Sequence, residues 1–237
     1  TTTGGNNVAI GSAALDGNTT ASDNVAIGIN ALGASNTSAN NVAIGTGAMD
    51  ANTSGSGVAV GKDALGANTT GGSNTAVGYA ALTANTTASN NVGIGTSALA
   101  AATTGDRNTA VGSAAGDAIT TGVRNTAVGF SALSSTTTAN YNSALGAFAL
   151  SDNSTGANNT ALGYYALAVN TTASNNTAVG YQALQANTTG EINSAFGSQA
   201  LYTNTTGFGN TAVGKAALYT NNGNNNTAVG HEALELN

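Results

Sequence analysis

A glycine that recurs at a fixed interval constrains the fold of this chain more than any other feature. It follows an apolar residue, most often in the pattern Ala-Val-Gly or Ala-Ile-Gly, and we call it the marker glycine. Eleven of the thirteen intervals between marker glycines are 17 residues, and the other two are 16. We therefore predict one repeat array over residues 1–237, a fragment of a longer fibre. The marker glycines are Gly11, Gly28, Gly45, Gly61, Gly78, Gly95, Gly112, Gly129, Gly146, Gly163, Gly180, Gly197, Gly214 and Gly230.

Apolar residues occupy fixed positions around the marker glycine. Alanine stands three residues after it in all fourteen repeats, and leucine comes next except at Met49 and Gly116. The residue before it is always Val, Ile, Leu or Phe, and such constancy indicates a packed interior. A 17-residue repeat is too short for two helices, and Asn-Thr-Ala-Val-Gly alternates as a short strand does. We predict an all-β fold, a parallel β-solenoid of about fourteen coils stacked about 4.8 Å apart.

Other constant positions predict how the coils stack. An asparagine stands four residues before the marker glycine in thirteen of the fourteen repeats, and stacked asparagines form amide ladders. The marker glycine fits a corner with a positive φ or a close backbone approach. The Asn-Thr-Thr segment supplies side-chain hydrogen bonds to the backbone of a turn. We predict structural roles for Asn74, Gly78, Ala81, Leu82, Asn108, Gly112, Asn176, Gly180, Ala183 and Leu184.

The interior of a single coil is thin. Each coil offers one Val or Ile, one Leu and two or three alanines, against about 1–2 kcal/mol of backbone entropy for every residue. The constant alanine after each marker glycine predicts a face that another chain approaches closely. We therefore expect a parallel homotrimer, because closure about a common axis is a frequent symmetric solution.

Several segments resemble a known family. The stretches "NNVAIG" at Asn6–Gly11 and Asn40–Gly45, "DNVAIG" at Asp23–Gly28 and the many "NTAVG" copies resemble the head repeats of trimeric autotransporter adhesins. The longer unit with Asn-Thr-Thr-Gly is similar to repeats of bacteriophage tail fibres and bacterial surface fibres. The resemblance covers all fourteen repeats, although the adhesin heads have a shorter coil. It implies a left-handed β-roll of three chains in an extracellular fibre, on a cell surface or a virion, that performs or displays adhesion.

Composition argues against several other classes of protein. Four Lys plus Arg against ten Asp plus Glu give a net charge of −6, so we expect no nucleic-acid partner. No apolar run approaches the ~20 residues of a membrane span, so we expect no membrane insertion by this segment. The chain has no Cys and one His, His231, so we expect no metal, no cofactor and no catalytic activity.

Aromatic residues in the second half of the chain are candidate ligand contacts. Exposed aromatics commonly bind sugars or proteins, so a host-surface glycan or protein receptor is the expected partner if this segment binds one. Stacking on one another along a ladder is the alternative role. The candidates are Phe148, Tyr164, Tyr165, Tyr181, Tyr202 and Tyr219.

Two repeat rules break together near the middle of the chain. Gly116 stands where the column leucine is expected, and Ile119 stands where the Asn of the Asn-Thr-Thr segment is expected. We predict a local irregularity there. A gap in the packing beneath Gly116 belongs to the belt hypothesis for two nearby arginines, which is given next.

Arg107 and Arg124 lie one repeat apart in the same region. On neighbouring coils their like charges would repel, so something should offset the repulsion. One explanation is pairing with Asp106 and Asp117 in the same chain. The other is that a trimer gathers the guanidinium groups in a belt that binds an anion or an acidic partner.

An ice-binding solenoid is the alternative function. The pairs Thr19–Thr20, Thr69–Thr70, Thr171–Thr172 and Thr188–Thr189 would form regular columns, and low charge suits an ice-facing surface. However, adjacent residues on a strand point to opposite faces, so a pair cannot display both hydroxyls on one face. The glycine that often follows the pair favours a turn instead.

Overall fold

The computed structural model describes residues 3–34 and 37–236. The chain is an all-β parallel β-solenoid of about 13 turns, and the described residues contain no helix. It divides into two compact units, Thr1–Thr121 and Gly122–Asn237. The predicted fold class is therefore confirmed at the level of an all-β parallel solenoid.

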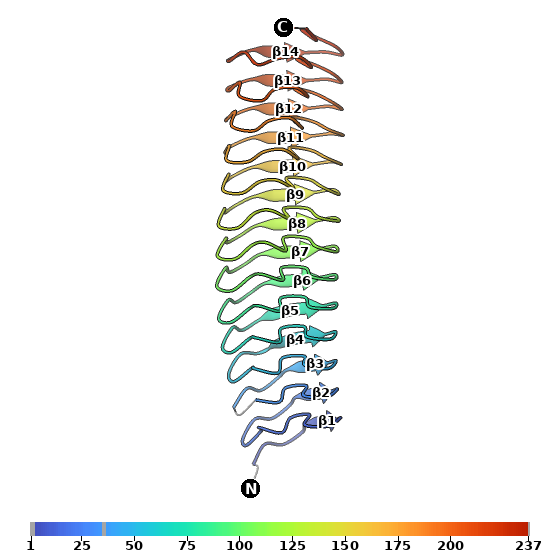
Figure 1. Ribbon diagram of the computed structural model, residues 1–237, viewed down its shortest axis with the longest axis vertical. Coiled ribbons are helices and arrows are strands. Elements are labelled where there is room, and N and C mark those ends of the chain that lie inside the picture. Colours follow the sequence, from blue (N-terminus) through green and yellow to red (C-terminus); the bar gives the residue numbers. More distant parts are fainter. Residues whose placement is uncertain (1–2, 35–36, 237) are drawn as a thin grey trace. The chain divides into compact units, whose positions relative to one another are not determined.

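Each coil contributes one short strand (Figure 1). In each unit every strand pairs in parallel with the next, in a register of one repeat, as in Thr177↔Ser194, Ala178↔Ala195 and Val179↔Phe196. The first unit contains β1 (Val8–Ile10), β2 (Val25–Ile27), β3 (Val42–Ile44), β4 (Gly57–Val60), β5 (Asn74–Val77), β6 (Val92–Ile94) and β7 (Thr109–Val111). The second contains β8 (Thr126–Val128), β9 (Ser143–Leu145), β10 (Thr160–Leu162), β11 (Thr177–Val179), β12 (Ser194–Phe196), β13 (Thr211–Val213) and β14 (Thr227–Val229).

The marker glycine ends each strand because no other residue fits there. Gly180 has φ 136°, and a Cβ on it would lie 2.5 Å from the carbonyl oxygen of Gly197 in the next coil. A turn follows each marker glycine. Its backbone carbonyl accepts a hydrogen bond from the backbone amide three residues later, as from Ala81 N to Gly78 O at 3.4 Å. The predicted role of Gly78, Gly112 and Gly180 is confirmed, because all three have φ between 136° and 138°.

The column leucines adopt a conformation that is unusual for leucine. Leu82 and Leu184 have φ of 52° and 53°, in the left-handed region, and both side chains are fully buried. The left-handed region costs about 1–2 kcal/mol for a residue other than glycine. Full burial of a leucine side chain gives about 1.5–3 kcal/mol, so burial outweighs the backbone strain.

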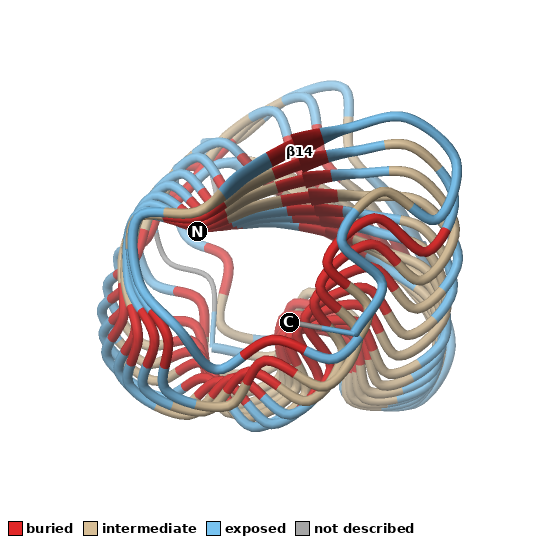
Figure 2. Ribbon diagram, turned by 90° about the horizontal axis from the view of Figure 1, so that it is seen from above, coloured by how far each residue is buried: buried red, intermediate tan, exposed pale blue. Residues whose placement is uncertain are grey.

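Two alanines per coil and the leucine form the interior of each unit. Ala76, Ala81 and Leu82 are all 0% exposed, and Ala183 and Leu184 repeat this in the second unit. Figure 2 shows the buried positions recurring at the same places in successive coils. The constant alanine that we expected to face another chain therefore lies inside its own coil, and that expectation is wrong.

The Val or Ile before the marker glycine lies outside, contrary to the prediction. The strand alternates, so the alanine at its centre points inward and the residues on either side point outward. The interior admits only a small residue at the strand, because a Cβ on Gly93 would already lie 3.2 Å from Leu82 Cγ. The larger aliphatic side chain is consequently left on the outer face.

Two columns of buried asparagines join the coils. The strand column contains the asparagine four residues before each marker glycine. Its side-chain carbonyl accepts a hydrogen bond from the backbone amide of the equivalent asparagine in the next coil, as from Asn193 N to Asn176 Oδ1 at 2.9 Å. In the turn column, the Asn of Asn-Thr-Thr, side chain bonds side chain, as from Asn187 Nδ2 to Asn170 Oδ1 at 2.9 Å. The predicted ladder of side-chain amides is thus found mainly in the turn column. In the strand column, which includes Asn74, Asn108 and Asn176, the hydrogen bonds between coils run mostly from backbone amides to side chains.

The threonine after each turn asparagine also bonds the next coil. The hydroxyl of Thr69 donates to the carbonyl oxygen of Thr86 at 2.9 Å, and that of Thr188 donates to Thr205 at 3.0 Å. The second threonine of the pair, such as Thr87 or Thr189, is exposed. The pairs therefore perform the turn chemistry that the sequence predicted.

Candidate binding surfaces

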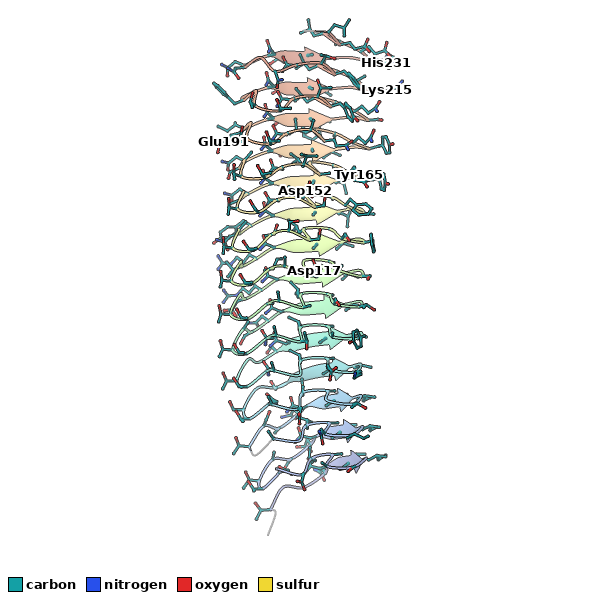
Figure 3. All side chains as sticks on the ribbon, viewed as in Figure 1. Asp117, Asp152, Tyr165, Glu191, Lys215 and His231 are labelled. Carbon is teal, nitrogen blue, oxygen red and sulfur yellow. The ribbon has the colours of Figure 1, made fainter. Side chains whose placement is uncertain are left out.

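An aromatic cluster lies on the second unit, beside the ends of strands β8 to β11. We use this name for Phe130, Phe148, Tyr164, Tyr165 and Tyr181, which are the first or second residues after four successive marker glycines. Because each marker glycine ends its strand at the same place, these residues stack from coil to coil. In Figure 3 the labelled Tyr165 lies at the opposite side of this unit from Glu191.

The rings of the aromatic cluster contact one another. Phe148 stacks on Tyr165 with centroids 4.9 Å apart and an interplanar angle of 10°, and Tyr164 stacks on Tyr181 at 5.9 Å and 10°. Phe130 meets Phe148 edge-on at 5.3 Å. Loss of hydration, and then the proximity of Tyr165, raises the pKa of the Tyr164 phenol above its ordinary value. The cluster is thus a packed surface ladder that still exposes Phe130, Tyr164 and Tyr181.

The other aromatic candidates form a separate pair. Tyr202 and Tyr219 stand five residues after their marker glycines and stack with centroids 5.1 Å apart. The structure therefore brings Phe148, Tyr164 and Tyr165 together with Tyr181, but it places Tyr202 and Tyr219 in another column. Sequence reasoning missed Phe130, although it follows a marker glycine as Tyr164 and Tyr181 do.

The two arginines are exposed and lie in different units. Arg124 Nη1 donates to the Tyr141 hydroxyl at 2.6 Å, and its guanidinium lies 5.4 Å from the centre of that ring. In the described part of its own unit, Arg107 makes no ion pair with a carboxylate. Asp106 instead accepts from the backbone amide of Ser89 at 2.6 Å. The predicted pairing of Arg107 with Asp106 or Asp117 is therefore wrong.

The expected packing gap at Gly116 is filled. A Cβ on Gly116 would lie 3.0 Å from Ile119 Cδ1 and 3.2 Å from Leu99 Cδ2. Ile119 is 1% exposed, so its side chain occupies the space that the column leucine fills in other coils. The two departures from the repeat compensate each other, and the prediction of a gap is wrong.

The outer sheet face is the second surface. We use this name for two outward columns, the residue before each marker glycine and the residue two positions earlier. None of these residues is buried, and Leu145 and Phe196 are 48% and 42% exposed. We call the column directly before the marker glycine the outer aliphatic column. It contains Ile10, Ile27, Ile44, Val60, Val77, Ile94 and Val111 in the first unit, and Val128, Leu145, Leu162, Val179, Phe196, Val213 and Val229 in the second.

The second column of the outer sheet face differs between the units. In the first unit it holds Val8, Val25, Val42, Val58, Thr75, Val92 and Thr109. In the second it holds Thr126, Ser143, Thr160, Thr177, Ser194, Thr211 and Thr227. Within the described chain, no hydrogen bond engages the hydroxyls of this column in the second unit. The face is therefore mostly aliphatic in the first unit, apart from Thr75 and Thr109, and mixed hydroxyl and aliphatic in the second.

The described residues hold no cluster of acidic, His or Cys side chains that could bind a metal ion. His231 Nε2 lies 3.4 Å from Glu232 Oε1, and no three His, Cys, Asp or Glu side chains come together among the described residues. Asp117 Oδ1 is buried without a hydrogen-bond partner in the described structure. Burial raises the pKa of the Asp117 carboxyl, although backbone hydrogen bonds oppose the shift. The described residues also enclose no pocket.

In the described part of the chain, no helix has the length and apolar character needed to cross a membrane. No family model, no curated protein and no solved structure matches this chain. The two surfaces therefore have to be interpreted from their own chemistry.

Proposed function

We propose that this chain is a non-catalytic structural and adhesive segment of an extracellular trimeric fibre, either a surface adhesin or a phage tail fibre. One observation carries the proposal: every coil leaves an aliphatic or aromatic side chain exposed or partly exposed beside its marker glycine, on the outer sheet face. Soluble monomers rarely expose long continuous apolar patches. Association of three chains, each wound as a left-handed β-roll, would remove this surface from water.

The asparagine columns support a fibre. They join each coil to the next by buried hydrogen bonds, such as Asn170 Nδ2 to Asn153 Oδ1 at 2.8 Å and Asn176 Nδ2 to Gly190 O at 2.9 Å. A buried amide bonded on both sides resists separation of the coils, because opening would leave it unpaired. Such a segment would transmit tension along the stack and serve as a spacer.

The aromatic cluster is the part of this segment that we propose for adhesion. Tyr164 and Tyr181 combine exposed ring surface with hydroxyl groups, which are the chemistry of contacts to a glycan or a protein receptor. The ladder holds the rings in place, so binding would cost little side-chain ordering. Tyr202, Tyr219, Arg107 and Arg124 remain candidate contacts outside the cluster.

Ice binding remains the second candidate, but on a different surface from the threonine pairs. In the second unit the outer sheet face displays a column of unpaired hydroxyls beside a column of aliphatic side chains. Because neighbouring parallel strands lie about 4.8 Å apart, the hydroxyl column and the aliphatic column both repeat at this spacing and form a regular array. A trimer that buries this face would leave it unavailable to ice.

Sedimentation equilibrium on the purified chain tests the proposal. A mass of three chains is expected, independent of moderate salt because the face carries no charge. A folded, stable monomer would overturn the trimeric fibre. Thermal hysteresis and ice-shaping activity in such a monomer would favour the second candidate.

A further inference from the structure

The aromatic cluster ends at Tyr181, and one face of that ring has no ring neighbour. Tyr164 stacks on the other face, with centroids 5.9 Å apart and an interplanar angle of 10°. The next residue in the same column is Ser198, whose side chain is too short to continue the stack. Among the described residues Tyr181 makes no other ring contact, and it is 49% exposed. We call the ring face toward Ser198 the open face.

Two glutamines border the open face. Gln182 follows Tyr181 in the chain, and Gln199 occupies the equivalent position in the next coil. Gln199 thus stands one coil after Tyr181 in the neighbouring column. The same relationship brings the ring centroids of Phe130 and Phe148 within 5.3 Å of each other. The repeat therefore places Gln199 beside the Tyr181 ring.

The two glutamine side chains bond each other and keep polar groups free. Gln199 Nε2 donates to Gln182 Oε1 at 3.0 Å. In the described part of the chain, no hydrogen bond engages Gln182 Nε2 or Gln199 Oε1, so one amide offers a donor and the other an acceptor. Both residues are only partly buried. Neighbouring hydroxyls of a sugar ring, each of which donates and accepts, match such a pair.

The surroundings of the open face carry no charge. From Phe130 to Gln199, the two columns that follow the marker glycines contain no charged residue. Lys215 is the first one beyond Tyr181, two coils and therefore about 10 Å further along the stack. An acidic or basic ligand would find no opposite charge at the open face. The chemistry of the site therefore suits an uncharged ligand.

The size of the aromatic cluster favours a sugar over a protein as the ligand. Its rings belong to four successive coils, which span about 14 Å along the stack. A stable protein–protein interface buries about 800 Å² on each partner. One open ring face and two amides provide far less area than that, but they are enough for a single sugar ring.

We infer that Tyr181, Gln182, Ser198 and Gln199 form a binding site for an uncharged sugar, which stacks on the open face and hydrogen-bonds to the two glutamine amides. The inference rests on the proposed adhesive function and adds the position of the site and the class of ligand. The bond between the glutamines orients their amides before the sugar arrives, so binding costs little side-chain ordering. The site follows the marker glycines and so lies outside the outer sheet face.

Substitutions that cover the open face test the site without removing the aromatic cluster. Ser198→Phe adds a ring next to Tyr181 and extends the ladder by one coil. Lys215→Phe is the matched control, because it adds the same ring to the same column two coils away from Tyr181. The double variant Gln182→Leu, Gln199→Leu keeps the side-chain volume and removes both amides. Circular dichroism first establishes that each variant keeps the parent fold.

Saturation-transfer NMR with the methyl glycosides of glucose, galactose, mannose and N-acetylglucosamine measures binding, and an array of neutral and acidic oligosaccharides extends the search. At least one neutral sugar should bind the parent. Ser198→Phe and the double glutamine variant should each weaken its affinity by roughly tenfold or more, because the stacking contact or the hydrogen bonds are lost. Lys215→Phe should bind that sugar as the parent does.

Equal affinity in the parent and in Ser198→Phe or the glutamine variant would overturn the inference, because the sugar would lie elsewhere. Binding of acidic sugars alone would also overturn it. A parent that binds no sugar, but binds a protein receptor through the aromatic cluster, would exclude the sugar site and leave the adhesive function standing. A parent that binds neither would overturn both, while the trimeric state is tested separately by sedimentation.

Discussion

Ile119 fills the space beside Gly116: a Cβ on Gly116 would lie 3.0 Å from Ile119 Cδ1. A double-mutant cycle should therefore show that these two positions are energetically coupled. Gly116→Leu alone should lower the free energy of unfolding by about 1–3 kcal/mol through overpacking. Ile119→Asn alone should lower it by about 2–5 kcal/mol, since it removes a buried side chain. The double variant restores the repeat pattern and should lose less than the sum, with a coupling of about 0.5–3 kcal/mol measured by urea unfolding.

The backbone does not explain this coupling, because Gly116 has φ 56° and the column leucines have similar values. Gly116→Ala serves as the matched control, since alanine adds only the Cβ. Losses that simply add in the double variant would mean that the two positions do not share one space.

Removal of a strand-column asparagine should destabilise the stack. Asn176→Ala removes the acceptor of Asn193 N at 2.9 Å and the donor to Gly190 O at 2.9 Å. Each buried group left unpaired costs about 1–3 kcal/mol. Asn175→Gly is the control, because Asn175 is exposed and has φ 62°, which glycine adopts freely. Thermal unfolding should separate the two variants clearly, and equal melting temperatures would contradict the importance of the column.

Truncation of a column leucine should be among the most damaging changes. Leu99 and Leu167 are 0% exposed, so Leu99→Ala or Leu167→Ala should cost about 2–5 kcal/mol for each chain. In a trimer all three chains carry the defect. Tyr181→Ser is the comparison, because Tyr181 is 49% exposed and its loss should matter little to unfolding. Similar melting temperatures for the leucine and tyrosine variants would reverse our assignment of inside and outside.

Asp117 should make the stability depend on pH. Its folded-state pKa lies above the ordinary value of 3.8, so the folded protein holds the proton more tightly than the unfolded chain. The stabilisation from this carboxyl is therefore present below pH 3.8 and is lost as the pH rises through the raised pKa. Asp117→Ala should raise the melting temperature slightly near neutral pH, and the gain should shrink in acid. Solvent screening keeps the effect small, since the carboxyl is only partly buried.

Asp16→Ala is the control for the pH experiment, because Asp16 occupies the same column as Asp117 but its side chain is exposed. It removes an exposed carboxylate and shows how much of any change comes from loss of a surface charge alone. An Asp117→Ala variant that is less stable than the parent at neutral pH would show that its hydrogen bonds outweigh the burial of its charge.

The aromatic cluster should bind the receptor if this segment performs adhesion. The triple variant Tyr164→Ser, Tyr165→Ser, Tyr181→Ser should lose binding on a glycan array and to candidate protein receptors. It should also lose a few tenths to about 1.5 kcal/mol for each ring pair removed. The variant Tyr202→Ser, Tyr219→Ser removes a ring pair in another column, so comparison of its binding with that of the triple variant shows which candidate contacts bind the receptor. Unchanged binding by the triple variant would leave the cluster with a stacking role only.

The repeat period made the solenoid predictable from sequence. Marker glycines every 16 or 17 residues predicted one coil per repeat, and the strands do pair in a register of one repeat. The turn role of Asn-Thr-Thr was also predictable, because Asn, Thr and Gly favour side-chain bonds to the backbone of turns.

The side of the strand that faces inward was not predictable. Alanine lies on one side of the strand and Val, Ile, Leu or Phe on the other, so each side carries a constant apolar residue and hydrophobic periodicity cannot choose between them. The choice depends on space: the column leucine from the turns already fills the interior, since a Cβ on Gly93 would lie 3.2 Å from Leu82 Cγ. The compensation of Gly116 by Ile119 was hidden for the same reason, because it depends on a contact between two different columns.

The burial of the turn asparagines has a consequence for producing this protein. Segments such as Asn68-Thr69-Thr70 and Asn187-Thr188-Thr189 match the acceptor pattern for N-linked glycosylation, which ordinarily marks an exposed loop. Here the amide nitrogen of Asn187 is buried and donates to both Asn170 Oδ1 and Gly190 O, at 2.9 Å each. In a eukaryotic secretory pathway a sugar could reach that nitrogen only before the coil closes, and its bulk would then prevent closure. Glycosylated chains should therefore accumulate unfolded, whereas expression without this modification should yield stacked coils.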